Sequence, residues 1–190
     1  MNNLFYNIIR GFLRIMVFLF FHPKVKGREN IKEEGSIVLA GNHTKWLDPL
    51  LLIATVPRKI HFMTKIELFK GIEGVVVRNM GCIPVNRKIH DGDSLKSAKE
   101  ELRKGEVVGI FPEGTINRTD DILMPFKIGA VKMSNDTDSV IVPFVIKGKY
   151  NIIGKSISIE FLKSRKISSD LEMENKKLRN EISKKLEEFN

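Results

Sequence analysis

Short apolar runs alternate along this chain with longer segments in which apolar residues recur at helical spacing. The apolar runs predict strands at residues 37–40, 59–63, 81–86, 106–111 and 140–146, with a short strand or connector at 25–31. Residues 155–161 alternate between apolar and polar and predict an exposed strand. The spaced segments predict helices at residues 4–21, 49–55, 65–70, 91–104, 128–133 and 170–189. Because the two kinds of element alternate, we expect an α/β fold. Pro84 favours a sheet edge or a bulge, and Pro143 is expected to break its strand.

The first predicted helix is apolar over most of its surface. Its polar residues fall on one narrow stripe, since they are spaced four, three and four residues apart: Asn3, Asn7, Arg10 and Arg14. The two arginines, and an uninterrupted apolar run only from Ile15 to Phe21, argue against a transmembrane helix, which needs about twenty apolar residues. No small-residue cleavage site follows, which argues against a signal peptide. The helix is therefore either interfacial or docked on the chain's own core.

The charge near this helix favours the interfacial alternative. Residues 1–30 hold five Lys or Arg and a single acidic residue, Glu29. A Phe-rich apolar face with basic flanks is typical of a segment that lies in an anionic membrane surface. We therefore expect residues 1–22 to be an interfacial helical segment with peripheral, monotopic membrane attachment, followed by a single α/β domain over residues 23–190.

The overall charge narrows the classes of partner. The chain has 32 Lys and Arg against 23 Asp and Glu, a formal net charge of +9, which suits nucleic acid, an anionic membrane or a phosphorylated substrate. Nucleic acid is disfavoured, because the basic residues are dispersed and only two Tyr and one Trp accompany them. The single Cys82 excludes an intrachain disulfide and a Cys-rich zinc site, and it suits a reducing cytoplasm. The histidines lack the spacing of metal ligands, so we expect no metal.

A polar loop after the predicted strand 37–40 contains His43 and Asp48. A carboxylate that holds one imidazole nitrogen lets the other nitrogen accept a proton at neutral pH. Pro49 disfavours a helical backbone at Asp48, so we expect a strand-end loop or broken turn rather than one face of a helix. Taken alone, the pair is better explained as a loop histidine with a capping aspartate.

Three further strand ends carry polar residues that can bind a phosphate. They are Lys65 after strand 59–63, Arg87 after strand 81–86, and the segment after strand 106–111 that contains Glu113, Gly114, Thr115 and Arg118. In α/β sheets ligands bind beyond the carboxyl ends of strands, so these side chains and the His43–Asp48 pair are expected in one crevice. Arg grips a phosphate through two parallel hydrogen bonds, Lys acts as a point charge, and a glycine lets the backbone approach a ligand.

At these residues the chain resembles the 1-acylglycerol-3-phosphate acyltransferase (PlsC) family over nearly its whole length. The motifs that carry the resemblance are Asn42-His43 with Asp48-Pro49, Lys65 to Phe69 with Gly81, Ile83 and Arg87, Phe111 to Thr115, Pro125 to Ala130, and Val142 to Phe144. The chain departs from the family at Ile116, where many members carry an arginine, and Arg118 is a candidate to supply that charge.

The resemblance implies a mixed sheet flanked by helices and an enzyme of phospholipid biosynthesis on the cytoplasmic face of the cell membrane. It implies transfer of an acyl group from acyl-ACP or acyl-CoA, a co-substrate rather than a cofactor, to the sn-2 hydroxyl of 1-acylglycerol 3-phosphate, giving phosphatidic acid.

The resemblance also assigns roles to the residues that match its motifs. It makes His43 the general base and Asp48 the residue that orients it. It places Lys65, Arg87, Arg118 and the Glu113-Gly114-Thr115 segment at the substrate, with Glu113 binding a glycerol hydroxyl or anchoring the arginines. The alternatives are another acceptor, glycerol 3-phosphate or a different lysophospholipid, and a non-catalytic protein that binds anionic membranes.

Overall fold

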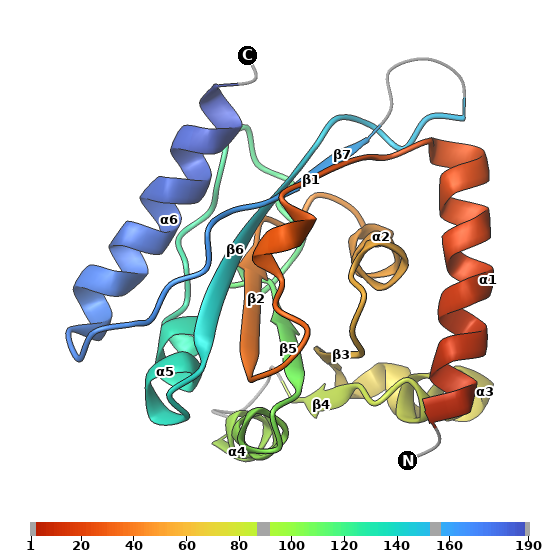
Figure 1. Ribbon diagram of the computed structural model, residues 1–190, viewed down its shortest axis with the longest axis horizontal. Helices are drawn as coiled ribbons and strands as arrows, with labels where there is room; N and C mark the ends of the chain where they lie inside the picture. The colour runs from red at the N-terminus through yellow and green to blue at the C-terminus, as the bar shows by residue number, and fades with distance from the viewer. Residues whose placement is uncertain (1–2, 87–91, 153–156, 189–190) are drawn as a thin grey trace.

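One seven-stranded sheet forms the centre of the protein (Figure 1). The computed structural model describes residues 3–86, 92–152 and 157–188. The strands are β1 (Lys24–Lys26), β2 (Ile37–Gly41), β3 (Ile60–Lys65), β4 (Ile83–Val85), β5 (Val107–Ile110), β6 (Val140–Lys147) and β7 (Ser158–Phe161). They lie in the order β1-β7-β6-β2-β5-β3-β4, and every pair of neighbours is parallel except β6 and β7. The predicted α/β fold with a mixed sheet is confirmed.

Helices cover both faces of this sheet, with α1 and α2 on one side and α5 and α6 on the other (Figure 1). The helices are α1 (Asn3–Phe21), α2 (Asp48–Thr55), α3 (Gly71–Asn79), α4 (Gly92–Arg103), α5 (Gly129–Asp136) and α6 (Leu171–Glu187). Two short 3₁₀ turns, η1 (Arg28–Asn30) and η2 (Ile66–Phe69), complete the described elements. The helix expected at 65–70 is thus the 3₁₀ turn η2. The sequence pattern missed α3, because its apolar residues form no stripe that faces the core and its one buried residue is Gly74.

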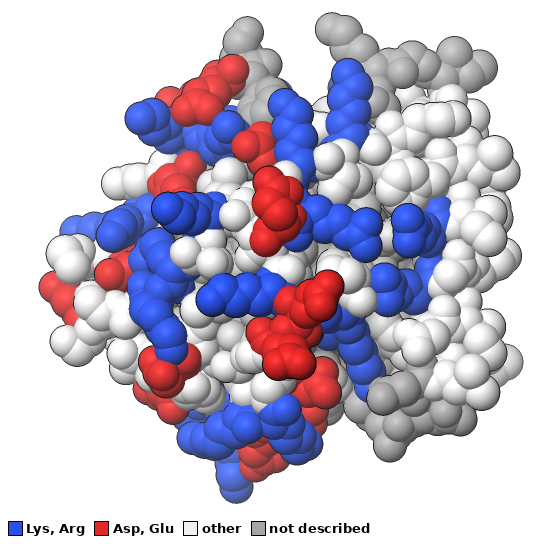
Figure 2. All heavy atoms as spheres, in the orientation of Figure 1, with Lys and Arg blue, Asp and Glu red and all other residues white. Residues whose placement is uncertain are grey.

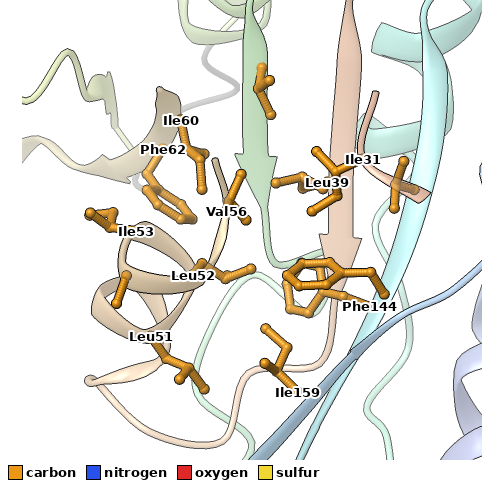
Figure 3. Packing of buried hydrophobic residues seen from close by; sticks show 14 of the residues in the cluster. Ile31, Leu39, Leu51, Leu52, Ile53, Val56, Ile60, Phe62, Phe144 and Ile159 are labelled. Carbon is orange, nitrogen blue, oxygen red and sulfur yellow. The ribbon is translucent and has the colours of Figure 1, made fainter. Parts of the chain in front are cut away.

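The central strand β2 shows how the sheet separates two apolar cores. All five of its residues are buried, as expected for a parallel strand that is covered on both faces. Ile37 and Leu39 point into a first core shared with α1 and α2 (Figure 3). Val38 and Ala40 point into a second core shared with α4, α5 and α6. Because both faces are fixed by packing, the loop that follows Gly41 leaves the sheet at a well-defined place.

The N-terminal helix α1 packs one side against the first core and exposes the other. Tyr6 and Val17 are buried, and the Tyr6 hydroxyl accepts the backbone N–H of Ile60 at 3.1 Å. The outward side carries a stripe of exposed apolar residues: Leu4, Ile8, Phe12, Ile15 and Leu19. By length and composition alone, the segment 4–21 could also cross a membrane. It packs across α2 at the side of the domain (Figure 1).

Two strand predictions need correction. Pro143 does not break β6, which runs unbroken from Val140 to Lys147 with Pro143 opposite Ala40 of β2. The missing N–H of Pro143 disrupts no ladder, because the pairing with β7 ends one residue away, where Phe144 lies opposite Phe161. The Pro143 carbonyl still accepts the N–H of Leu162, the residue after β7. The strand β7 is not an exposed one, since it pairs with β1 and β6 and buries two of its four residues; residues 153–156 lie outside the described part of the chain. Pro84 does lie in an edge strand, β4.

Candidate active site

A cavity of about 760 Å³ opens beside the carboxyl ends of β2, β3 and β5. His43 reaches it from the loop after β2, Lys65 from the end of β3, and Thr115 and Arg118 from the loop after β5. The remaining wall is largely apolar and includes Trp46, Phe62, Met63, Leu68, Phe111 and Ile116. The cavity therefore joins one imidazole, two cations and one carboxylate, that of Glu67, to an apolar lining, and the excess of positive charge suits a ligand with an anionic head and a hydrocarbon part.

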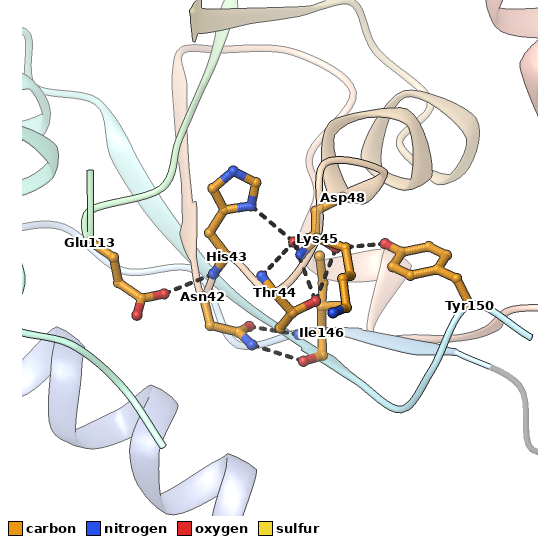
Figure 4. A network of polar contacts seen from close by, with 8 residues as sticks. All are labelled: Asn42, His43, Thr44, Lys45, Asp48, Glu113, Ile146 and Tyr150. Atoms are coloured by element: carbon orange, nitrogen blue, oxygen red, sulfur yellow. Dashed lines mark hydrogen bonds and ion pairs between the residues drawn. The ribbon is translucent and has the colours of Figure 1, made fainter. Parts of the chain in front are cut away.

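The imidazole of His43 and the carboxylate of Asp48 form a hydrogen bond, as the sequence predicts (Figure 4). His43 Nδ1 lies 2.9 Å from Asp48 Oδ2, and the Asp48 side chain is completely buried. Because an ionised carboxylate can only accept hydrogen bonds, the proton of the neutral imidazole belongs on Nδ1. Nε2 then has a free lone pair, and Figure 4 shows this nitrogen pointing away from Asp48. This is the arrangement that a general base requires.

The intervening loop wraps around the Asp48 carboxylate. The backbone N–H groups of Thr44 and Lys45 donate to Oδ2 at 2.6 and 2.8 Å, and the Tyr150 hydroxyl donates to Oδ1 at 2.6 Å. These donors satisfy a buried charge that would otherwise be costly. The expected strand-end loop is confirmed, since residues 42–47 are not helical, but Asp48 is itself the first residue of α2, with Leu47 as the N-cap, so Pro49 does not keep Asp48 out of the helix. Proline is tolerated here because the first helical turn needs no N–H donor.

The His43 ring and backbone are fixed by the loop after β5. The ring stacks on Phe111 with centroids 4.0 Å apart and an interplanar angle of 15°. The His43 N–H donates to Glu113 Oε1 at 2.8 Å, and the His43 carbonyl accepts the N–H of Asn117 at 2.8 Å. A base held at its ring and at both backbone groups has little conformational entropy to lose when substrate binds.

Glu113 lies beneath the site rather than in the cavity wall. Its side chain is 4% exposed, and its second oxygen accepts the N–H of Met124 at 3.0 Å. Both carboxylate oxygens are therefore occupied by backbone donors, from His43 and from Met124. Burial raises the pKa of this carboxyl above its usual value, although the two N–H donors oppose the shift. In this structure Glu113 joins the β2 loop to the segment around residue 124.

The other predicted substrate residues are distributed unevenly around the cavity. Lys65, Thr115 and Arg118 line it. Gly114 has a left-handed backbone (φ +75°), and the side chain of Lys127 packs so close that a Cβ at this position would lie 2.9 Å from Lys127 Cε. Gly114 thus permits close packing with the Pro125 to Ala130 motif. Arg87 lies outside the described residues.

Three residues that shape the site had no role assigned to them from the sequence. Tyr150 and Phe111 contact Asp48 and His43 as described above. Asn42 is buried and makes two hydrogen bonds of 2.8 Å with the backbone of Ile146 in β6, which extends the β2–β6 pairing by one position (Figure 4). Asn42 and Phe111 stand in motifs, whereas Tyr150 follows β6 in a segment without any motif and could not be found from its sequence context.

Comparison with known proteins extends these observations. Residues 22–147 match the model of the Acyltransferase family. The 1-acyl-sn-glycerol-3-phosphate acyltransferase of Bacillus subtilis (strain 168) is 32% identical over 145 residues, which cover 75% of this chain and 71% of that protein. The protein of the same name from Borreliella burgdorferi is 34% identical over 136 residues, 70% of this chain and 54% of that protein. The chain thus spans between about half and seven tenths of these two relatives.

The fold has also been solved experimentally in another protein. The crystal structure of the 1-acyl-sn-glycerophosphate acyltransferase PlsC from Thermotoga maritima superposes with a TM-score of 0.80 and 23% sequence identity. The superposition covers 97% of this chain and 79% of that chain. At this identity the likeness establishes a shared fold, including the helices that flank the sheet.

Proposed function

This chain belongs to the acyltransferase family, and from that membership we propose that it transfers a fatty acyl group from an acyl thioester to the sn-2 hydroxyl of 1-acylglycerol 3-phosphate, forming phosphatidic acid. The observation that carries the proposal is the hydrogen-bonded His43–Asp48 pair at a cavity that also holds Lys65 and Arg118. The names of the Bacillus and Borreliella relatives support this choice of acceptor.

In the proposed mechanism His43 is the general base. A lipid hydroxyl is a weak nucleophile, so Nε2 takes its proton as the oxygen attacks the thioester carbonyl. Asp48 keeps the imidazole oriented through Nδ1 and stabilises the imidazolium that forms. The tetrahedral intermediate collapses, the carbon–sulfur bond breaks, and the imidazolium returns the proton to the departing thiolate. The nucleophile belongs to the substrate, so the mechanism involves no acyl-enzyme.

The cavity supplies separate surfaces for the two ends of the acceptor. Lys65 and Arg118 are exposed cations at the wall and would bind the phosphate. We propose Arg87 as a third residue that binds the phosphate, and this assignment rests on the family resemblance alone. The apolar side chains of Trp46 and Leu68 would contact the hydrocarbon chain.

We further propose that the protein attaches to the cytoplasmic face of the cell membrane through one leaflet. The exposed stripe of α1 offers large apolar side chains, and Figure 2 shows an almost uncharged surface on the side where α1 lies in Figure 1. Lys and Arg gather next to this surface and over the middle of the same face. Trp46, which lines the cavity, is 70% exposed, and Ile72 of α3 is 88% exposed. Apolar groups beside basic ones favour an anionic lipid surface.

A thioester-consumption assay across acceptors tests the proposed reaction. Purified protein is given acyl-CoA or acyl-ACP together with 1-acylglycerol 3-phosphate, glycerol 3-phosphate or lysophosphatidylcholine, and released thiol and lipid product are measured. We expect thiol release and phosphatidic acid with 1-acylglycerol 3-phosphate. A preference for another acceptor would change the substrate. No consumption with any pair would refute the enzyme and leave a membrane-binding role.

A further inference from the structure

Tyr150 holds the edge of the Asp48 carboxylate that faces away from His43 (Figure 4). Its hydroxyl donates to Oδ1 at 2.6 Å, a length typical of a hydrogen bond to a charged oxygen. The Thr44 hydroxyl contacts the same oxygen at the longer distance of 3.2 Å. Because Asp48 is completely buried, water cannot readily replace the Tyr150 hydroxyl if it is removed.

Tyr150 is itself fixed from a distant part of the chain. It follows β6, is separated from Asp48 by 102 positions, and packs partly buried against the first core. Phe21, the last residue of α1, meets the Tyr150 ring edge to face with centroids 5.4 Å apart. Burial and the charge of Asp48 raise the pKa of the Tyr150 hydroxyl above its usual value, so it remains a donor throughout the neutral range.

We propose that Tyr150 is a positioning residue for the His43–Asp48 pair, and that Phe21 at the end of α1 holds it in place. The effect on reaction rate rests on the proposed function, whereas the effect on the imidazole does not. As His43 takes a proton, the carboxylate must stay aimed at Nδ1 to stabilise the imidazolium. Two backbone donors hold Oδ2, and the Tyr150 hydroxyl fixes the rotation of the carboxylate by holding Oδ1.

A kinetic comparison of two tyrosine variants tests this role. Tyr150→Phe removes one hydroxyl with little change in shape, and Tyr6→Phe is the matched control, because it removes the buried hydroxyl that accepts the Ile60 N–H. We expect kcat to fall about tenfold or more in Tyr150→Phe, because the variant lacks a hydrogen bond to a charged group that supports the chemical step. The KM of both substrates should stay within about twofold, because this hydrogen bond does not contact either substrate. Tyr6→Phe should lower the melting temperature and keep kcat.

A second variant removes the packing contact of the Tyr150 ring and leaves the Tyr150 hydroxyl in place. Phe21→Leu removes the aromatic edge contact and is expected to lower kcat by a smaller factor than Tyr150→Phe, again without a change in KM. A kcat of folded Tyr150→Phe within twofold of the parent would overturn the proposal. An equal loss in Tyr6→Phe would overturn it too, since a general loss of stability would then explain both results.

A spectroscopic measurement separates this inference from the proposed function. Long-range ¹H–¹⁵N correlation spectra report which nitrogen of each histidine carries the proton, and His43→Ala identifies the signals of His43. We expect His43 in the parent to be held as the Nδ1–H form, and Tyr150→Phe to show exchange or a mixture of forms. Unchanged His43 signals would refute the positioning role. This result stands even if no acceptor is acylated, in which case the proposed function alone fails.

Discussion

Glu113→Gln separates two roles for the glutamate of the Phe111 to Thr115 motif. The structure places both carboxylate oxygens on backbone N–H donors, those of His43 and Met124. Glutamine keeps the shape and one acceptor, but turns an NH₂ group toward the other donor. We therefore expect Glu113→Gln to destabilise the fold and to displace His43, with kcat affected more than KM. A glutamate that bound a glycerol hydroxyl would instead give a raised KM at unchanged stability.

The size of the effect follows from the two hydrogen bonds. One of them is lost, and a hydrogen bond to a charged group contributes ~1.5–3 kcal/mol. Glu113 is 4% exposed, so the backbone N–H that loses its acceptor has little access to water, and this adds to the loss of stability. The free energy of unfolding should fall by about 2–4 kcal/mol. For a chain of 190 residues this corresponds to a fall in melting temperature of roughly 5–15 °C.

Thermal unfolding and steady-state kinetics of the same preparations decide between these roles. Glu67→Gln is the matched control, because Glu67 is an exposed carboxylate at the cavity wall. Its loss should leave the free energy of unfolding within about 0.5 kcal/mol of the parent. If Glu113→Gln melts with the parent and its only defect is a higher KM, the structural role assigned to Glu113 is wrong.

Three further predictions concern other parts of the protein. Replacing Ile8, Phe12 and Ile15 together with serine removes the centre of the exposed α1 stripe, so sedimentation with anionic liposomes should fall at least tenfold while the melting temperature changes little; unchanged binding would contradict the membrane role of α1. Arg118→Gln should raise the KM for 1-acylglycerol 3-phosphate about tenfold and leave the KM for the thioester unchanged; equal effects on both would count against a phosphate site. Burial lowers the pKa of His61 below 6.5, so the native state resists its protonation and loses stability as the pH falls from 6.5 through that lower value. Urea titrations should therefore show a smaller change in the free energy of unfolding between pH 7.5 and pH 5.5 for His61→Gln than for the parent.

The sequence predicted the sheet well because its signals are local. The strand β2 is an apolar run with buried residues on both faces, and α6 begins at Leu171 with Asp170 accepting the N–H of Met173 as a cap. The helix α3 escaped prediction because its apolar residues Ile72 and Val75 face outward, so no stripe marks a core-facing side. Pro143 misled the prediction because the effect of a proline depends on which neighbour its N–H would face, and only the sheet order decides that.

The candidate site was predictable only where motifs fall at strand ends. His43, Lys65, Thr115 and Arg118 do meet at one cavity, since parallel strands bring their carboxyl ends to one edge. The second hydrogen bond of Glu113 comes from the N–H of Met124, outside the motif, and sequence spacing does not reveal it. Tyr150 reaches Asp48 across 102 positions, through a contact between side chains that no local pattern records.

The central claim is that His43 is the base that activates the hydroxyl of 1-acylglycerol 3-phosphate. The most direct measurement is phosphatidic acid formed from labelled 1-acylglycerol 3-phosphate by the parent, by His43→Ala and by His22→Asn. His22 is an exposed histidine whose positive φ of 43° suits asparagine, so this variant controls for the loss of an imidazole. We predict product with the parent and with His22→Asn, and a loss of at least about 1,000-fold in kcat for folded His43→Ala. Phosphatidic acid formed by His43→Ala at a rate near that of the parent would contradict the account.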